Sequence, residues 1–354
     1  MASSAKAKKS TMVDPIEANR RNWDERATIH ARDTTGEYML DRFRSGEDAL
    51  HAIEAAELGD ISGKRVLHLQ CHIGRDTLCL VRHGAVATGL DFSGVAIDVA
   101  RRLSSETGLK ADFVQGTVDN APHLTPGPFD LVFTTWGTIC WLPDIAVWAR
   151  VIGSVLAPGG ELYFADAHPS FLVLEEHAGR LSPMYDFQTP AERPLEFCSP
   201  TTYTGDPTIM AHQITREWIH PLSAILSALI GAGLTIVMFH EHEVLPWRGV
   251  SSLVPASDRL WRLPDGHPRI PLSISLRAKR QCRLSRLPAS SNALGRWRPI
   301  ARAHGRPDRS APGGRGDKSG PVSRLPRWRA RDQAWSLSSS DTTCHSAVSR
   351  LGKR

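Results

Sequence analysis

The fold of this chain is decided by the stretch Lys64-Arg-Val-Leu-His-Leu-Gln-Cys-His-Ile-Gly-Arg-Asp-Thr77. It predicts a short apolar strand, a tight turn that ends at Gly74, and a helix that begins near Asp76. A second apolar run, Val86–Leu90, is followed by Asp91, seventeen residues after Gly74. Such a turn presents backbone N–H groups and a helix N-terminus to a ligand, and the carboxylate can accept from both ribose hydroxyls. The pattern therefore indicates the nucleotide-binding half of an α/β sheet.

Strands and helices alternate along the residues that follow. Strands are predicted at Val66–Leu69, Val86–Leu90, Ala111–Val114, Asp130–Thr134 and Glu161–Ala165, and helices at Asp76–His83, Val95–Thr107 and Asp144–Leu156. Ser93 is a suitable N-cap for the second of these helices, and Gly108 a suitable end. Alternation of this kind predicts a parallel sheet with helices on both faces.

The run Leu222–Phe239 has eighteen residues without a charge, close to the length of a membrane helix. Gly231 and Gly233 divide it into a helix, Ser223–Ile230, and a β-branched strand, Leu234–Phe239, so no membrane span is predicted. A last strand, Pro271–Arg277, can pair antiparallel beside the strand that ends this run.

The remaining segments define the domain organisation. Residues 1–14 are expected to be disordered, 15–62 to form an N-terminal helical cap, and 63–279 to form the main domain. The cap helices are predicted at Glu17–Arg26, Gly36–Arg44 and Asp48–Leu58. An insertion at about 167–220 is expected to carry a hairpin that pairs 195–204 with 209–218. Residues 280–354 are rich in Arg, Ser and Pro without apolar periodicity, and are expected to be disordered.

Charge is distributed unevenly between the two parts of the chain. Residues 280–354 carry a net charge of +13, whereas residues 1–279 carry −7. The main domain is therefore not expected to bind nucleic acid. The basic tail is either an arm for RNA or membranes or an extension without function. No apolar stretch follows the basic residues at 1–9, and the six cysteines have no C-x-x-C spacing, so a cytoplasmic location is expected without a zinc finger.

Three features together resemble the class I S-adenosylmethionine-dependent methyltransferases, of the small-molecule type related to ubiquinone-pathway enzymes. They are the strand–turn–helix at Val66–Thr77, the carboxylate Asp91, and the segment Phe129–Trp136 followed by Leu156-Ala-Pro-Gly-Gly-Glu-Leu-Tyr-Phe164. The resemblance covers residues 15–279. It implies a Rossmann-like sheet of order 3-2-1-4-5-7-6 with strand 7 antiparallel. It also implies S-adenosylmethionine as cofactor and methyl transfer by in-line displacement to a small-molecule acceptor.

The first motif departs from the family pattern. Where the family has acidic-x-Gly-x-Gly-x-Gly, this chain has His68, Gln70, His72 and Gly74. Two interpretations follow: Gln70 and His72 supply substitute polar contacts, or the chain is a non-catalytic binding module with weakened or lost cofactor binding. An NAD-dependent oxidoreductase is less well supported, because Gln70–Asp76 lacks Gly-x-Gly-x-x-Gly.

The resemblance also implies where ligands bind. The cofactor-binding residues are expected to be His68, Gln70, His72, Gly74, Asp91, Phe92, Thr117, Val118, Thr135 and Trp136. Trp141, Tyr185 and Trp218 are candidates for the acceptor site, and Trp23 and Tyr38 for closing the cap over the cofactor.

A general base is needed only if the acceptor is protonated, because the sulfonium methyl is already activated. The candidates are Asp166, His168 and His220. His240 and His242 lie two apart in a strand and share one face, as metal ligands can. With no third ligand placed beside them, no metal site is predicted.

Overall fold

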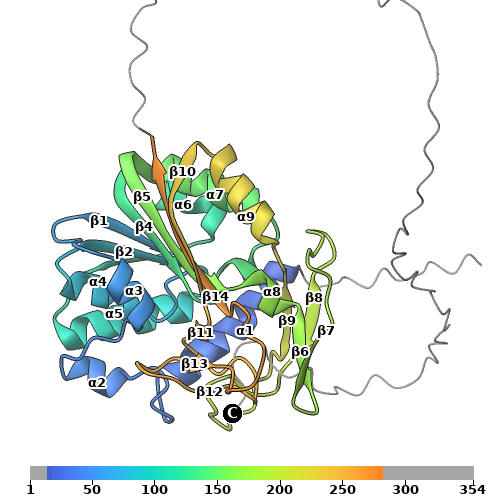
Figure 1. Ribbon diagram of the computed structural model, residues 1–354. Helices are drawn as coiled ribbons and strands as arrows, with labels where there is room; N and C mark the ends of the chain where they lie inside the picture. Colours follow the sequence, from blue (N-terminus) through green and yellow to red (C-terminus); the bar gives the residue numbers. More distant parts are fainter. Residues whose placement is uncertain (1–13, 282–354) are drawn as a thin grey trace, which may run out of the picture. The chain divides into compact units, whose positions relative to one another are not determined.

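The computed structural model describes residues 14–281, which Figure 1 shows in colour. The predictions of disorder for residues 1–14 and 280–354 fall almost entirely outside this range. Within it, each helix is either too short or too polar to span a bilayer. The apolar run at Leu222–Phe239 is a helix followed by a strand, α9 (Leu222–Gly231) and β10 (Leu234–His242).

A seven-stranded sheet lies at the centre, in the order β3-β2-β1-β4-β5-β14-β10. The strands are β1 (Arg65–Leu69), β2 (Val86–Asp91), β3 (Asp112–Gln115), β4 (Phe129–Thr135), β5 (Leu156–Ala167), β10 and β14 (Ser273–Arg280). Neighbouring strands from β3 to β5 are parallel, and β14 runs antiparallel to both β5 and β10. The implied order 3-2-1-4-5-7-6 with an antiparallel strand 7 is confirmed.

Helices cover both faces of this sheet (Figure 1). One core contains the buried faces of α4 (Arg75–Arg82) and α5 (Gly94–Thr107), and the other those of α7 (Ile145–Val155) and α9. The caps of α5 are as predicted: the Ser93 hydroxyl accepts from Ala96 N at 3.0 Å, and Gly108 takes a left-handed conformation. Four shorter helical segments were not expected; they are η1 (Val118–Asn120), α6 (Ala121–Leu124), η2 (Ile139–Trp141) and α8 (Pro169–Leu172).

The N-terminal cap consists of α1 (Pro15–His30), α2 (Leu40–Arg44) and α3 (Ala52–Glu57). Helix α1 packs on α5 and on strand β9 (Ile214–Glu217) of the insertion. The Asn19 amide joins α1 to this strand in both directions: Nδ2 donates to Arg216 O and Oδ1 accepts from Arg216 N, each at 2.7 Å. Cap and insertion are therefore joined both by packing and by hydrogen bonds.

The insertion holds more strands than expected. Strand β9 pairs antiparallel with β8 (Leu195–Cys198), a shorter hairpin than the predicted pairing of 195–204 with 209–218. A second hairpin joins β6 (Leu174–His177) to β7 (Arg180–Pro183). Beyond the insertion, three two-residue strands form a small sheet; they are β11 (Val244–Leu245), β12 (Val254–Pro255) and β13 (Trp261–Arg262).

The boundaries of two predicted strands are wrong for physical reasons. Strand β5 begins at Leu156, because the Pro-Gly-Gly segment continues the strand, with a register shift against β4. A Cβ on Gly160 would approach Phe129 O to 2.8 Å, so only glycine allows the two backbones this close. Strand β14 extends to Arg280, since Leu234 of the edge strand still pairs with that residue.

Gly74, the N-cap of α4, is tightly packed, which predicts a large loss of stability on substitution. It has φ +76°, and an added Cβ would lie 2.6 Å from Ala100 Cβ and 2.7 Å from the Phe113 ring. Gly74→Ala should lower the free energy of unfolding by about 2–4 kcal/mol, from left-handed strain and overpacking together. Gly108→Ala is the matched control, because Gly108 has φ +70° and open space around it. It should cost about 1 kcal/mol. Equal losses in urea unfolding would contradict the packing role of Gly74.

Candidate functional site

A cavity of about 440 Å³ opens where β1, β2 and β4 end. Its walls come from the loops after these strands, from the cap and from the insertion. Nine of the ten predicted cofactor-binding residues line it: His68, Gln70, His72, Asp91, Phe92, Thr117, Val118, Thr135 and Trp136. Trp23, Tyr38 and Trp141 line it too. Gly74 does not, because it packs beneath the turn against α5 and β3.

The turn after β1 keeps the backbone path of a glycine-rich loop. Gln70, His72 and Gly74 all have positive φ, of 57°, 49° and 76°. Left-handed conformations cost non-glycine residues about 1–2 kcal/mol each, so neighbouring contacts must hold them. Gln70 Nε2 donates to Thr138 O at 2.9 Å, and His72 N donates to Asp91 Oδ2 at 2.8 Å. Gln70 Oε1 is buried and has no hydrogen-bond partner within residues 14–281.

Asp91, the last residue of β2, is buried beside this turn. Its Oδ2 accepts from His72 N, and its Oδ1 accepts from Ser93 N at 2.9 Å. Burial raises the pKa of Asp91 to about 6, although these N–H donors favour the charged form. The backbone N–H of Phe92 also favours the charged form. A carboxylate has about four acceptor sites, so at least one remains for a ligand beside these backbone donors.

The next wall of the cavity follows β3. Thr117 and Val118 lie there, and Phe92, which follows β2, lines the cavity as well. Gly116 N donates to Asp91 O at 2.8 Å, which joins the two loops. Asp119, an exposed carboxylate, also lines the cavity and was not expected.

A group of aromatic and imidazole rings covers the turn, and we call it the lid cluster: Trp23, His30, Tyr38, His72 and Tyr203. His72 Nε2 and His30 Nδ1 lie 2.8 Å apart, and the Trp23 ring meets the His72 ring edge-on at 5.0 Å. Tyr38 stacks on His30, and its hydroxyl is hydrogen-bonded to that of Tyr203. Enclosure lowers the pKa of His72 to about 3 and that of His30 well below its usual value, so both rings are neutral at pH 7.

Residues that follow β4 form another part of the cavity wall. The indole N–H of Trp136 donates to Glu54 Oε1 of α3 at 3.0 Å, and that of Trp141 donates to Gly137 O at 2.6 Å. Burial raises the pKa of Glu54 to about 8, so this carboxyl group is mainly protonated at neutral pH. The two indoles therefore have fixed orientations at the cavity wall.

An ion pair at the start of α4, between Arg75 and Asp76, lies in the wall of the cavity. Arg75 Nε donates to Asp76 Oδ1 at 2.7 Å; although burial opposes it, Arg75 lowers the pKa of Asp76. His51 lines the same region, and burial lowers its pKa to about 3. His68 Nδ1 lies 2.8 Å from Thr77 Oγ1, and burial lowers its pKa to about 4. Asp76 is eight residues past His68, where the first motif lacks its carboxylate, and it lines the cavity.

The three candidate bases lie outside the cavity and make structural contacts. Asp166 accepts from Gly137 N at 2.7 Å and from Thr138 N at 3.0 Å, which shapes the loop after β4. His168 caps α8, where its Nδ1 accepts from Ser170 N at 3.0 Å, and His220 Nε2 donates to Leu142 O at 2.8 Å.

Two acceptor-site candidates also lie away from the cavity. The Tyr185 hydroxyl donates to Glu175, and Trp218 Nε1 donates to Ala191 O at 3.0 Å. Sequence reasoning missed several wall residues: Glu37, His51, Arg75, Asp76, Asp119, Tyr203 and Trp247. Arg75 and Asp76 follow the turn directly, so their position offered a signal. Tyr203 and Trp247 are distant in sequence, and only the folded chain brings them here.

Comparisons with known proteins agree with this arrangement. A family model described as "Methyltransferase domain" matches residues 66–160, which contain β1 to β4 and the turn. Ubiquinone biosynthesis O-methyltransferase of Yersinia pestis (strain Pestoides F) is 36% identical over 107 residues, which are 30% of this chain and 44% of that protein. The matched region is therefore less than half the length of this relative.

Similar solved structures have low sequence identity. An S-adenosylmethionine-dependent methyltransferase from Mesorhizobium loti has a TM-score of 0.46 and 21% identity, covering 64% of this chain and 96% of that one. Magnesium protoporphyrin IX methyltransferase from Synechocystis, with bound SAM, has a TM-score of 0.43 and 13% identity, covering 77% and 99%. The family match and the sheet order lead to one conclusion: this chain contains a class I S-adenosylmethionine-dependent methyltransferase domain.

Proposed function

We propose that this protein transfers a methyl group from S-adenosylmethionine to a small-molecule acceptor by in-line displacement. The observation that carries the proposal is the cavity at the ends of β1, β2 and β4, with the Asp91 carboxylate in its wall. This wall belongs largely to the residues that match the methyltransferase family. In this proposal, the acceptor binds beneath the lid cluster and the Trp141 indole.

The donors and acceptors of the wall fit the cofactor. Asp91 has a free acceptor site for a ribose hydroxyl. The unpartnered Gln70 Oε1 and the Asp76 carboxylate are acceptors for the methionyl ammonium group. Phe92, Thr117 and Val118 would contact the adenine ring. Gln70 and Asp76 thereby replace the carboxylate that would stand at His68.

The residues around the acceptor mainly position it and exclude water. S-adenosylmethionine, when bound, supplies a methyl group already activated by the sulfonium charge. The aromatic rings of Trp23, Trp141 and Tyr203 enclose a largely apolar space, which suits a small acceptor with substantial apolar surface. Proximity and orientation can supply about 7–11 kcal/mol of the barrier in such reactions. Asp166, His168 and His220 lie outside the cavity, and no proton transfer is assigned to them.

A second candidate, a non-catalytic binding module, is favoured by one observation. The His72 side chain projects from a position where the family has glycine, and it is fastened to His30 beneath Trp23. It therefore occupies space next to the turn that glycine would leave open.

Calorimetric titration with S-adenosylmethionine tests both candidates. Methyl transfer requires binding, together with release of S-adenosylhomocysteine when a metabolite extract is added. No heat and no thermal protection would contradict cofactor binding outright. Binding without transfer to any extract component would favour the second candidate.

The raised pKa of Asp91 predicts a pH-dependent affinity for S-adenosylmethionine. Ribose hydroxyls donate to the ionised carboxylate, and protonation removes these acceptor sites as the pH falls through about 6. Affinity should fall about tenfold between pH 7.5 and pH 5, because about nine-tenths of the carboxylates are protonated one unit below the pKa.

Asp91→Asn should reduce affinity about 10- to 100-fold at pH 7.5, the value of one or two hydrogen bonds to a charged group. It should also flatten the pH profile. Asp98→Asn, in the exposed part of α5, is the control and should leave both unchanged. A wild-type affinity that is constant from pH 7.5 to 5 would exclude Asp91 as a ribose ligand.

Gln70 and His72 can be separated by single glycine substitutions. Both have positive φ, so each change relieves similar backbone strain. Gln70→Gly removes the free Oε1 acceptor and should weaken S-adenosylmethionine binding about 5- to 10-fold, the value of one hydrogen bond. His72→Gly removes a ring but no cofactor acceptor, and should change affinity less than twofold. Unchanged affinity in Gln70→Gly would show that its side chain makes no required contact.

A further inference from the structure

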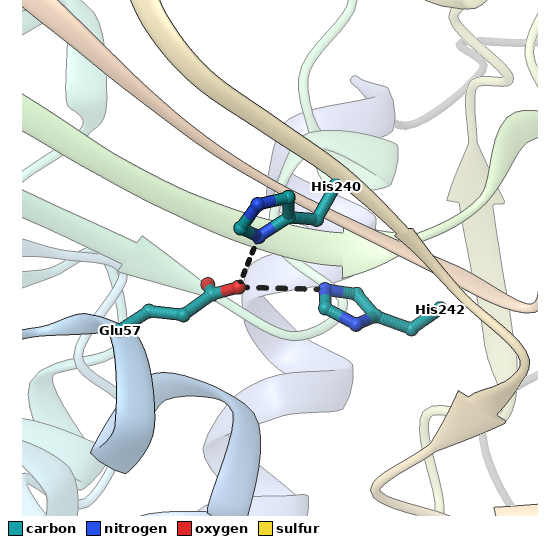
Figure 2. A group of neighbouring side chains, drawn as sticks. All are labelled: Glu57, His240 and His242. Carbon is teal, nitrogen blue, oxygen red and sulfur yellow. Dashed lines mark hydrogen bonds and ion pairs between the residues drawn. The ribbon is translucent and has the colours of Figure 1, made fainter.

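We propose that Glu57, His240 and His242 form a binding site for a divalent transition metal, with Zn²⁺ as the best match. The two histidines share one face of β10, as their spacing indicates, and the structure brings Glu57 of α3 beside them. Figure 2 shows both imidazole rings directed toward the same Glu57 carboxylate oxygen. None of the three residues lines the cavity, so the site is separate from that of methyl transfer.

The geometry places three ligand atoms around one point. His240 Nδ1 lies 2.7 Å from Glu57 Oε1, and His242 Nε2 lies 3.8 Å from the same oxygen. All three ligand atoms lie within 4.8 Å of one another. Ligands of a tetrahedral zinc ion lie about 2.0–2.2 Å from the metal, so these atoms need only small side-chain rotations to surround one.

The chemistry of the donor set selects the metal. Two imidazole nitrogens and one carboxylate oxygen suit Zn²⁺ better than Mg²⁺ or Ca²⁺, which prefer oxygen ligands. The His240 side chain is 53% exposed and that of Glu57 12%, so an ion can enter from solvent while the carboxylate stays fixed. Three protein ligands leave a fourth position for water.

Neighbouring side chains hold the carboxylate in a suitable orientation. The Tyr163 hydroxyl donates to Glu57 Oε2 at 2.9 Å, which leaves Oε1 turned toward the two rings. Ser275 Oγ donates to Oε1 at 3.0 Å; it also lies 2.8 Å from His242 Nε2, a contact that this nitrogen would exchange for the metal. Such outer contacts orient ligands in metal sites. Arg277 reduces the negative potential, because its Nη1 donates to Glu57 O at 3.0 Å, but it is paired with Glu161.

The competing explanation is a hydrogen-bonded cluster that never binds metal. The same contacts join α3 to β10 and β14 without an ion, since His240 can donate to Glu57 directly. A bound ion would make this connection stronger and would stabilise the fold, because it binds the native state alone. The two explanations therefore differ in their response to added zinc.

The test is titration of the full-length, chelator-treated protein with ZnCl₂, in competition with a chromophoric chelator. One equivalent should bind in the wild type. His240→Ala and His242→Ala should each weaken this binding more than about 100-fold, because loss of a ligand exceeds the effect of an outer contact. Ser275→Ala should weaken it about tenfold. His212→Ala is the matched control: His212 is an exposed histidine paired with Glu25, and no third ligand accompanies them within residues 14–281. It should leave the affinity unchanged.

Two further measurements keep the assignment falsifiable if a variant is unstable. Zn²⁺ should raise the Tm of the wild type and of His212→Ala, but not that of His240→Ala. Co²⁺ in place of Zn²⁺ should give visible absorption bands in the wild type that His242→Ala lacks. Absence of zinc binding, or equal affinity in the wild type and His240→Ala because the ion binds elsewhere, would overturn the proposal.

Discussion

The hydrogen bond from His72 N to the Asp91 carboxylate is the contact on which the site depends. It joins the turn after β1 to the end of β2 at 2.8 Å, within a turn where Gln70 and His72 both have positive φ. Such conformations are unfavourable for residues with a Cβ, so the turn persists because surrounding contacts hold it. Together with the bonds from Gln70 Nε2 to Thr138 O and from Cys71 N to Leu90 O, this contact holds the turn in its path beside the cavity.

In the lid cluster, the His72 side chain, which stands where the family has glycine, makes contacts to the cap. His72 connects the turn to His30 of α1, and Tyr38 connects the cap to Tyr203 of the insertion. Three segments that are distant in sequence therefore cover one cavity. Burial keeps both histidines neutral, and the charge of the cover comes from the buried Arg26 guanidinium, which lies over the Trp23 and Tyr203 rings. Arg75 and Asp76 at the start of α4 add an ion pair at the cavity wall. A cover made mainly of aromatic rings, with charged residues at the wall below it, fits the cofactor and the acceptor that we propose.

Helix α3 joins this cavity to the edge of the sheet. It has six residues and would not be stable alone. The carboxyl groups of Glu54 and Glu57, about one turn apart, connect it to different parts of the domain. Glu54 accepts from the Trp136 indole at the cavity wall, and Glu57 accepts from Tyr163 and lies against His240. A metal ion at Glu57 would thus act on the same helix that orients Trp136. The two sites remain distinct in their ligands and in their exposure to solvent.

The sequence alone determined the sheet and most of the residues that line the cavity after β1, β2 and β4. Strand patterns, capping residues such as Ser93 and Gly108, and the carboxylate at Asp91 depend on local chemistry, which neighbouring residues specify. Only the tertiary structure decided which polar residues converge. Asp166, His168 and His220 are needed for local hydrogen bonds, whereas Tyr203 and Trp247 reach the cavity from segments far along the chain. Glu57 joins His240 and His242 for the same reason: about 180 residues separate them, and no sequence pattern specifies a contact across that distance.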